Sequence, residues 1–307
     1  MQGLNNALFK MPLKYLFLVM SLFVQSVWAN DVSVRQYSDI RQSMHDLASA
    51  YPNTVNSVMV GPSDSGEMIE GVVIGNGPVH QLVVATHHGN EYGSTEVGMA
   101  VAEALAKNPI AGQSIYVIPV LNIDGYNKRR REEKNASGNS IDPNRDYPGP
   151  CGSEGPHRLK STASLAKFID RENIITSATL HTYQPAVVYP WGFATQDTNT
   201  EYDDLFKMLV RNATTYSKYE TGNSGKVIYP ANGTFEDYAY WNSGVWSILF
   251  ELGSSHYPSD ANIKEMIRVN VPGIRKMLEE SPKEKAVKHQ FTGRCDFNLV
   301  SHDKHDE

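Results

Sequence analysis

The stretch Thr86-His87-His88-Gly89-Asn90-Glu91 lies where a predicted strand passes into a predicted helix. The residues before it, 80–85, end in the apolar run Leu82-Val83-Val84-Ala85, which is typical of a buried strand. In an open α/β sheet, turns of this kind lie at the carboxyl ends of strands, where ligands bind. The stretch therefore predicts an α/β fold with a site at this turn. The helix that follows carries apolar residues at helical spacing: Val97, Ala100, Val101, Ala104 and Leu105.

His88 and Glu91 offer an imidazole and a carboxylate three residues apart, so both can converge on one metal ion. A catalytic zinc takes three protein ligands and leaves a fourth position for water. His87, His88 and His181 are the histidines that stand at the end of an apolar strand. We expect His88, Glu91 and His181 to hold one Zn²⁺ per chain. His87 is set aside because the three-residue count to Glu91 fits its neighbour.

Strands and helices alternate along the chain, which predicts an α/β domain with a mixed, largely parallel central sheet and helices on both faces. The polar segment 127–156 is rich in Gly, Pro and Asn, and loops of this length are usually functional. A glycine-rich loop is expected at 221–226, and a last helix is expected to bend or break at Pro272 before it ends at Glu280. The expected strands are 56–60, 69–74, 80–85, 114–120, 174–180, 187–189 and 246–250, and further helices are expected near 38–51, 163–170 and 203–213.

The composition is that of an ordinary soluble globular protein. The chain has 307 residues, of which 40% are hydrophobic and 20% charged, and its formal charge is -6. No long basic run occurs apart from residues 128–131. A nucleic-acid partner is therefore not expected.

The N-terminus predicts an exported protein. Lys10 and Lys14 precede an apolar run at 16–24, and Ala29 stands where a signal peptidase requires a small residue. The run is too short to span a bilayer. We expect a signal peptide at 1–29, a main domain at 30–280 and a polar tail at 281–307. The mature chain, without a membrane span, would reach the periplasm or the medium.

Two cysteines occur, Cys151 and Cys295. An exported chain meets an oxidising compartment, where pairs of cysteines tend to bond. Cys295 lies in the polar tail, which is short of apolar anchors. A disulfide between the two is a hypothesis, and two free thiols in a titration would contradict it.

Glu251 closes the last apolar strand, in Ile248-Leu249-Phe250-Glu251-Leu252-Gly253, where neither packing nor solvation explains a carboxylate. A general base beside a metal explains it. Zinc lowers the pKa of a water molecule to about 7, and a carboxylate can take the proton and pass it to a leaving amine. The alternative is a structural salt bridge.

Taken together, these residues resemble the funnelin-type zinc carboxypeptidases, a family of metallocarboxypeptidases. The resemblance covers most of the mature chain and follows the order of the family's motifs. It implies an enzyme that hydrolyses the C-terminal peptide bond of peptides with a free carboxylate, acting as a monomer with one zinc. The matching pieces are His88-Gly89-Asn90-Glu91 with H-x-x-E, Asn122-Ile123-Asp124-Gly125 with N-P-D-G, Asp142-Pro143-Asn144-Arg145-Asp146-Tyr147 with D-x-N-R-N-F, the third-ligand segment 181–183 with 189–191, and the late motifs 228–231 and 250–252.

The resemblance also implies roles for further residues. Asn144 and Arg145 would hold the terminal carboxylate of the peptide, since a planar guanidinium grips a carboxylate through two hydrogen bonds. Tyr229 would swing in to add a hydroxyl. Asp142 would accept a hydrogen bond from the ring of His88 and so fix its tautomer.

One arginine of Arg129, Arg130 and Arg131 would stabilise the oxyanion, a role in which losing a donor costs about 100-fold to 1000-fold. Arg131 is the first choice because it lies nearest the turn at 135–138. The loop spacing departs from the family's commonest pattern, so Arg130 remains an alternative. A solvated basic loop accounts for the other arginines.

In the family, the residue seven positions after the mobile tyrosine sets the side-chain preference, and counting from Tyr229 reaches Glu236. An acidic pocket floor would favour C-terminal Lys or Arg, or the amine-bearing diaminopimelate of peptidoglycan peptides. The alternative is that Glu236 meets only solvent. Asn90 replaces an arginine of the digestive members, so outer subsites would differ. We also expect no large activation segment after Ala29.

Three other functions are alternatives to a zinc carboxypeptidase. The H-G-N-E form resembles zinc deacylases of the aspartoacylase and succinylglutamate desuccinylase branch, which act on N-acyl amino acids, although Tyr183, Tyr229 and the signal sequence argue against it. A non-catalytic binding domain would not need Glu251 beside the metal and carboxylate residues. A serine hydrolase lacks support because no G-x-S-x-G elbow occurs.

Overall fold

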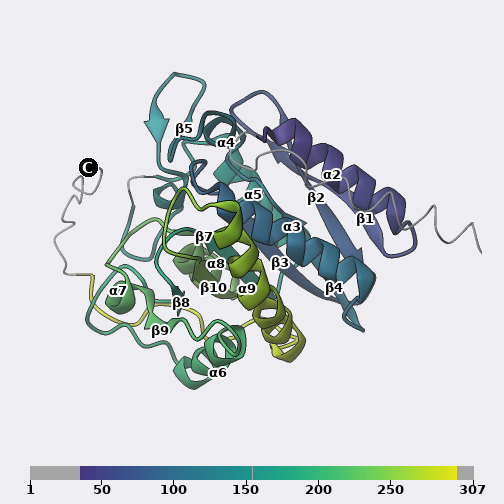
Figure 1. Cartoon of the computed structure of the whole chain (residues 1–307). Coiled ribbons are helices and arrows are strands. Elements are labelled where there is room, and N and C mark those ends of the chain that lie inside the picture. Colours follow the sequence, from purple (N-terminus) through teal and green to yellow (C-terminus); the bar gives the residue numbers. More distant parts are fainter. Residues whose placement is uncertain (1–34, 154, 296–307) are drawn as a thin grey trace, which may run out of the picture. The chain divides into compact units, whose positions relative to one another are not determined.

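An eight-stranded mixed sheet forms the centre of the fold (Figure 1). The computed structural model describes residues 35–153 and 155–295, so the expected signal peptide and residues 296–307 of the tail lie outside the described residues. The sheet order is β1-β2-β4-β3-β7-β10-β8-β9. The strands are β1 (Val55–Pro62), β2 (Met68–Gly75), β3 (Val79–Ala85), β4 (Gln113–Ile118), β7 (Thr176–His181), β8 (Ala186–Tyr189), β9 (Glu220–Asn223) and β10 (Trp246–Glu251).

Four neighbouring strands, β4, β3, β7 and β10, are parallel and form the middle of the sheet. On one side β2 pairs antiparallel with β4 and β1 antiparallel with β2, and on the other β8 pairs antiparallel with β10. β9 then runs parallel to β8. The expected mixed α/β sheet is thus confirmed.

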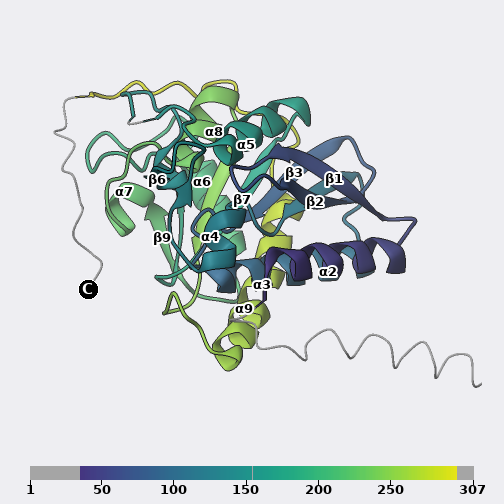
Figure 2. The same ribbon diagram turned by 90° about the horizontal axis from the view of Figure 1, so that it is seen from above.

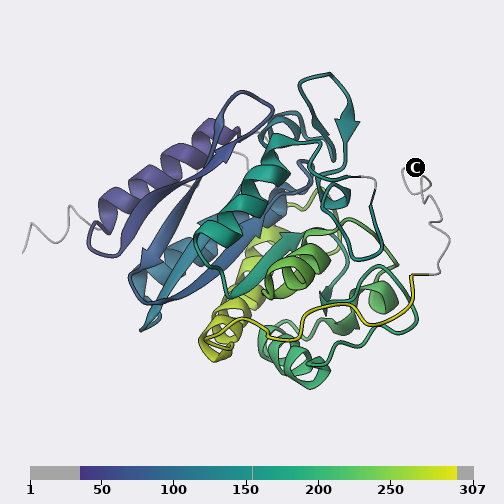
Figure 3. The same cartoon turned by 180° about the vertical axis from the view of Figure 1, so that it is seen from behind.

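Helices cover both faces of the sheet, as the views from above and behind show (Figures 2 and 3). One face carries α2 (Tyr37–Ala50), α3 (Tyr92–Lys107) and α9 (Asp260–Glu280), with α6 (Asp203–Ala213) packed against α9. The other face carries α5 (Lys160–Arg171) and α8 (Phe235–Ser243). Strand β3 is therefore enclosed, and Leu82, Val83, Val84 and Ala85 are fully buried.

The strands that carry the expected site residues end at the same level. Ala85 at the end of β3 pairs with Leu180 of β7, and His181 pairs with Glu251 of β10. The turn after β3 also lies directly against the turn after β4. A Cβ atom on Gly89 would come within 1.9 Å of the carbonyl carbon of Gly125, so this contact requires glycine.

Residues 127–156 are more ordered than a long loop predicts. They include the end of α4 (Ile123–Lys128), the hairpin of β5 (Glu133–Lys134) and β6 (Ser140–Ile141), and the 3-10 turn η3 (Pro143–Arg145). The buried carboxylate of Glu133 anchors the hairpin, because it accepts hydrogen bonds from the Ser161 hydroxyl and the Asp64 amide. These short elements have little apolar periodicity, which is why the pattern did not indicate them.

Two later elements differ from expectation. Helix α9 continues through Pro272, so the expected break does not occur there. Gly273 lies directly against the backbone of Ala213 in α6, and this packing offsets the hydrogen bond that proline removes. The expected loop at 221–226 instead ends β9 and begins the one-turn helix α7 (Ser224–Val227).

The C-terminal segment is tied to the domain. Cys151 and Cys295 form a disulfide, as hypothesised. The expected lack of apolar anchors was wrong, since Ala286 is buried and the ring of Phe291 lies 4.7 Å from that of Phe193 and 5.5 Å from that of Trp191.

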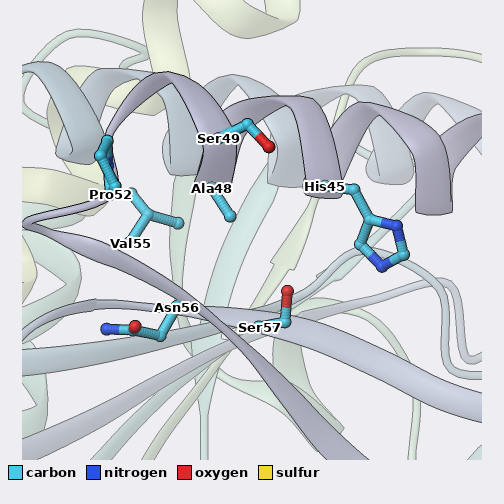
Figure 4. A pocket seen from close by; sticks show the side chains of 7 residues that line it. All are labelled: His45, Ala48, Ser49, Pro52, Val55, Asn56 and Ser57. Atoms are coloured by element: carbon cyan, nitrogen blue, oxygen red, sulfur yellow. The ribbon is translucent and has the colours of Figure 1, made fainter.

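A shallow groove of about 420 Å³ opens between α2 and the edge strand β1 (Figure 4). Its lining is mostly small or polar, and β2, β4 and β3 separate its strand from β7. Among the described residues, no helix is both long and apolar enough to cross a membrane.

Candidate active site

His88, Glu91 and His181 come together at the carboxyl ends of β3 and β7. One ligand atom from each of the three lies within 4.8 Å of the others, and all three side chains are buried. The Nδ1 atom of His88 lies 2.7 Å from Oε1 of Glu91, and Nδ1 of His181 lies 3.0 Å from Oε2. Two imidazole nitrogens and one carboxylate, turned towards one point, form the donor set of a catalytic zinc site.

The Glu91 carboxylate is kept ionised by its surroundings. Burial alone would raise its pKa, but the charges and hydrogen bonds of His88 and His181 outweigh burial and hold the pKa well below the ordinary value. The backbone amide of Thr182 also donates to Oε2 at 3.0 Å. An ionised carboxylate is the form that binds a cation.

The other nitrogen of the His88 ring is held by Asp142. Nε2 of His88 lies 3.0 Å from Oδ1 of Asp142, which turns Nδ1, the atom near Glu91, towards the metal position. Burial works to raise the pKa of Asp142, but the positive charges of His88, Arg131 and Arg145 hold it well below the ordinary value. Asp142 therefore lies where the sequence analysis expected it.

The three candidate arginines occupy different places. Arg131 donates from Nε to Asp142 at 3.0 Å and from Nη1 to Nδ1 of His88 at 3.2 Å. Arg130 instead pairs with Asp124 at 2.9 Å, and Arg129 lies over the ring of Tyr126 at 4.3 Å. The guanidinium of Arg131 thus contacts the metal-site residues directly.

Glu251 ends β10 beside His181, and its Oε2 atom is buried without a hydrogen-bond partner among the described residues. Burial and the negative charge of Glu91 raise the pKa of Glu251 well above its ordinary value, while Arg131 and Arg145 act in the opposite direction. No salt bridge explains this carboxylate in the described part of the chain. A buried carboxylate oxygen without a partner thus lies beside the candidate metal ligand His181.

Asn144, Arg145 and Tyr229 form a second polar group of the site. The 3-10 turn η3 carries Asn144 and Arg145, and Asp142 begins this turn by accepting a hydrogen bond from the Asn144 amide at 2.8 Å. Nη2 of Arg145 donates to the Tyr229 hydroxyl at 3.1 Å. Tyr229 is 45% exposed and follows α7, so its side chain has room to move.

Glu236 lies in the first turn of α8 and is buried, which excludes the alternative that it meets only solvent. Its Oε1 atom has no hydrogen-bond partner among the described residues. Its negative charge acts on Glu251 and raises the pKa of that group. Glu236 is therefore close enough to Glu251 for the two carboxylates to interact electrostatically.

His256 also lies at this site but was not predicted from the sequence. Its Nδ1 atom lies 3.9 Å from Oε1 of Glu91, and its ring contacts that of Tyr183 edge-to-face at 4.7 Å. His256 stands five residues after Glu251 in a loop, so the search for histidines at strand ends passed over it. The signal that could have indicated His256 in the sequence is its position only five residues after Glu251, a carboxylate at the end of a strand.

Fold and donor set together define a mononuclear zinc-type metal centre at the strand ends of a mixed α/β sheet. The family model for zinc carboxypeptidases matches residues 40–273. The chain therefore belongs to the zinc carboxypeptidase family. Members of this family are zinc enzymes, and the buried set His88, Glu91 and His181 fits one zinc ion.

Curated relatives are carboxypeptidases. The chain is 32% identical to human carboxypeptidase B over 167 residues, which cover 45% of this chain and 40% of that protein. It is 25% identical to carboxypeptidase B of the crayfish Astacus astacus over 255 residues, or 69% of this chain and 84% of that protein. The match thus spans less than half the length of the human protein.

Solved structures share the fold. Bovine thrombin-activatable fibrinolysis inhibitor, in complex with a tick carboxypeptidase inhibitor, matches with a TM-score of 0.71 at 17% identity, over 80% of this chain and 96% of that one. The murein-tripeptide amidase MpaA of Escherichia coli matches with a TM-score of 0.53 at 18% identity, over 75% of this chain and 94% of that one.

Proposed function

We propose that this protein is a zinc-dependent metallocarboxypeptidase that hydrolyses the C-terminal peptide bond of peptides. One observation carries the proposal: the metal-site residues, the unpaired carboxylate of Glu251 and the group formed by Arg145 and Tyr229 belong to a single site. Glu251 pairs with His181 in the sheet, and Asp142 contacts both polar groups: it binds His88 and Arg131, and it accepts from the Asn144 amide in the turn that carries Arg145. These contacts support a site for a terminal carboxylate next to a site for hydrolysis.

His88, Glu91 and His181 would hold the zinc ion, which when bound supplies a Lewis acid and lowers the pKa of water to about 7. Glu251 would act as the general base and return the proton to the leaving amine. Its missing hydrogen-bond partner supports this role, because a carboxylate held in a salt bridge would be a weaker base.

Arg131 would stabilise negative charge on the scissile carbonyl oxygen. Its guanidinium is held by Asp142 on one edge and reaches His88 with the other, so it is oriented before substrate arrives. Arg145 and Asn144 would bind the terminal carboxylate, and the Tyr229 hydroxyl, already in contact with Arg145, would add a third donor.

We further propose that Glu236 selects a cationic C-terminal side chain, that of Lys, Arg or diaminopimelate. A buried carboxylate with an unpaired oxygen favours an ammonium or guanidinium partner. Two of the curated relatives named above are carboxypeptidases B. The similarity to MpaA is a similarity of fold and says nothing about substrate. The proposal that diaminopimelate is a substrate therefore depends on the charge of Glu236 alone.

The test is mass spectrometry of peptides of matched sequence that end in Lys, Leu, diaminopimelate or a C-terminal amide, incubated with the zinc-loaded protein. Release of the last residue from the free acids but not from the amide is expected. If no residue is released, N-acyl amino acids become the next substrates to try, as for a zinc deacylase.

The preference is tested with Glu236→Gln. We expect the ratio of Lys release to Leu release to fall by about 10-fold or more, because a charge-assisted hydrogen bond is lost. Equal ratios in the variant and the parent protein would contradict the role of Glu236. The neighbouring Asp237 is not a suitable control, because its carboxylate holds the Gly192 amide.

We also propose that the protein is exported, with cleavage after Ala29, and works as a monomer. N-terminal sequencing of the mature protein and light scattering during size-exclusion chromatography test the two statements. A start other than Asn30, or the mass of a dimer, would contradict them.

A further inference from the structure

His87 is the neighbour of a metal-site residue but does not itself face the metal position. Its side chain is fully buried. Nε2 lies 3.1 Å from the hydroxyl oxygen of Tyr147, whereas Nδ1 has no partner among the described residues. A buried imidazole with a single hydrogen bond is held in one orientation by that bond.

The ring of His87 lies against His181. The two rings are stacked, with centroids 5.4 Å apart and planes 23° from parallel. Metal-ligating histidines usually donate their other ring N–H to a carboxylate or carbonyl, which fixes the ring. His88 does so through Asp142, but Nε2 of His181 has no hydrogen-bond partner among the described residues. Stacking on His87 takes the place of that hydrogen bond.

Tyr147 connects His87 and His181 to the part of the site that would bind substrate. Its amide donates to the carbonyl of Gly233 at 3.1 Å, and its ring contacts Phe235 at 5.3 Å and Tyr238 at 5.4 Å. Glu236 lies between Phe235 and Tyr238 in α8. The family motif D-x-N-R-N-F has phenylalanine where this chain has Tyr147, so the hydroxyl that meets His87 is a departure of this chain from that motif.

We propose that His87 and Tyr147 form a hydrogen-bonded pair that positions His181 for the metal ion and links it to the segment that carries Glu236. His87 is a positioning residue, which acts through the ring of His181. The proposal rests on the metal role of His181 in the proposed function.

The test measures zinc affinity by competition with a chelator, together with the visible absorption spectrum of the cobalt-substituted protein. Tyr147→Phe removes only the hydroxyl, and we expect zinc binding to weaken about 10-fold and the cobalt bands to shift, because changes behind metal ligands cost 10-fold to 100-fold in affinity. His87→Ala removes the stacked ring as well and is expected to reach the upper end of that range. Tyr238→Phe, which removes a hydroxyl from the other side of the same aromatic group, is the control and should match the parent protein.

The melting temperature of each metal-free variant separates positioning from folding. If His87→Ala fails to fold, Tyr147→Phe decides the question, since it keeps the ring. Zinc affinity within twofold of the parent protein and an unchanged cobalt spectrum in Tyr147→Phe would overturn the proposal, while peptide release by the parent protein would leave the proposed function intact. A parent protein that neither binds zinc nor releases residues would overturn the proposed function instead.

Discussion

His181 and Glu251 are direct partners in the parallel register of β7 and β10. The amide of Leu252, the residue after Glu251, donates to the carbonyl of His181 at 2.9 Å. A candidate metal ligand and the candidate base are therefore held side by side by the backbone of the sheet. Sites built on strands in this way are positioned more firmly than sites built on loops.

Glu251→Gln should separate hydrolysis from metal binding. Glutamine keeps the size of the side chain but cannot accept a proton, so peptide release is expected to fall by about 100-fold to 10000-fold. The variant should still bind one zinc ion per chain, which metal analysis after gel filtration would check. Activity close to that of the parent protein would exclude Glu251 as the general base.

Arg131 and Arg130 offer a matched comparison of neighbouring arginines. Arg131→Ala is expected to reduce kcat/KM by about 100-fold to 1000-fold, since it removes a donor directed at the developing oxyanion. Arg130→Ala removes a partly exposed ion pair with Asp124 and should change the rate by no more than about twofold. A larger loss in Arg130→Ala than in Arg131→Ala would reverse the assignment.

The sheet and the metal set could be predicted from sequence because both follow from local patterns. Apolar runs indicated where strands end, and strand ends in a parallel sheet lie together, so the distant His181 could be joined to His88 and Glu91. These are the cases in which spacing along the chain determines spacing in the fold.

Contacts between side chains of separate loops could not be predicted. Three consecutive arginines look equivalent in sequence, and they differ only because Asp142 reaches Arg131 while Asp124 reaches Arg130. The pairing of His87 with Tyr147 joins positions 60 residues apart through loop geometry that no periodicity encodes. That the helix would continue through Pro272 could not be predicted either, because the residue after it packs against α6, which is distant along the chain.

Arg145→Lys should weaken substrate binding through the terminal carboxylate. Lysine keeps the charge but loses the planar pair of donors, so KM for a free-acid peptide is expected to rise about 10-fold. The same peptide with a C-terminal amide, measured as a competitive inhibitor, is the control, since it offers no carboxylate to either side chain. An equal proportional rise in KM for the acid and in the inhibition constant of the amide would show that Arg145 acts on something other than the terminal carboxylate.

Glu133→Gln should change how stability depends on pH without touching the metal site. Burial raises the pKa of Glu133 to about 7 from its ordinary 4.5, although hydrogen bonds from Ser161 and Asp64 lower it. Between these values the folded protein keeps a proton that the unfolded chain has lost, so rising pH favours unfolding. The contribution of Glu133 to the free energy of unfolding thus falls between pH 4.5 and pH 7, by on the order of 3 kcal/mol.

Urea unfolding of the zinc-loaded parent protein and of zinc-loaded Glu133→Gln, each at pH 5 and at pH 8, measures this change in stability. The parent protein should lose more stability between the two pH values than Glu133→Gln does, and equal losses would mean that Glu133 is ionised at both.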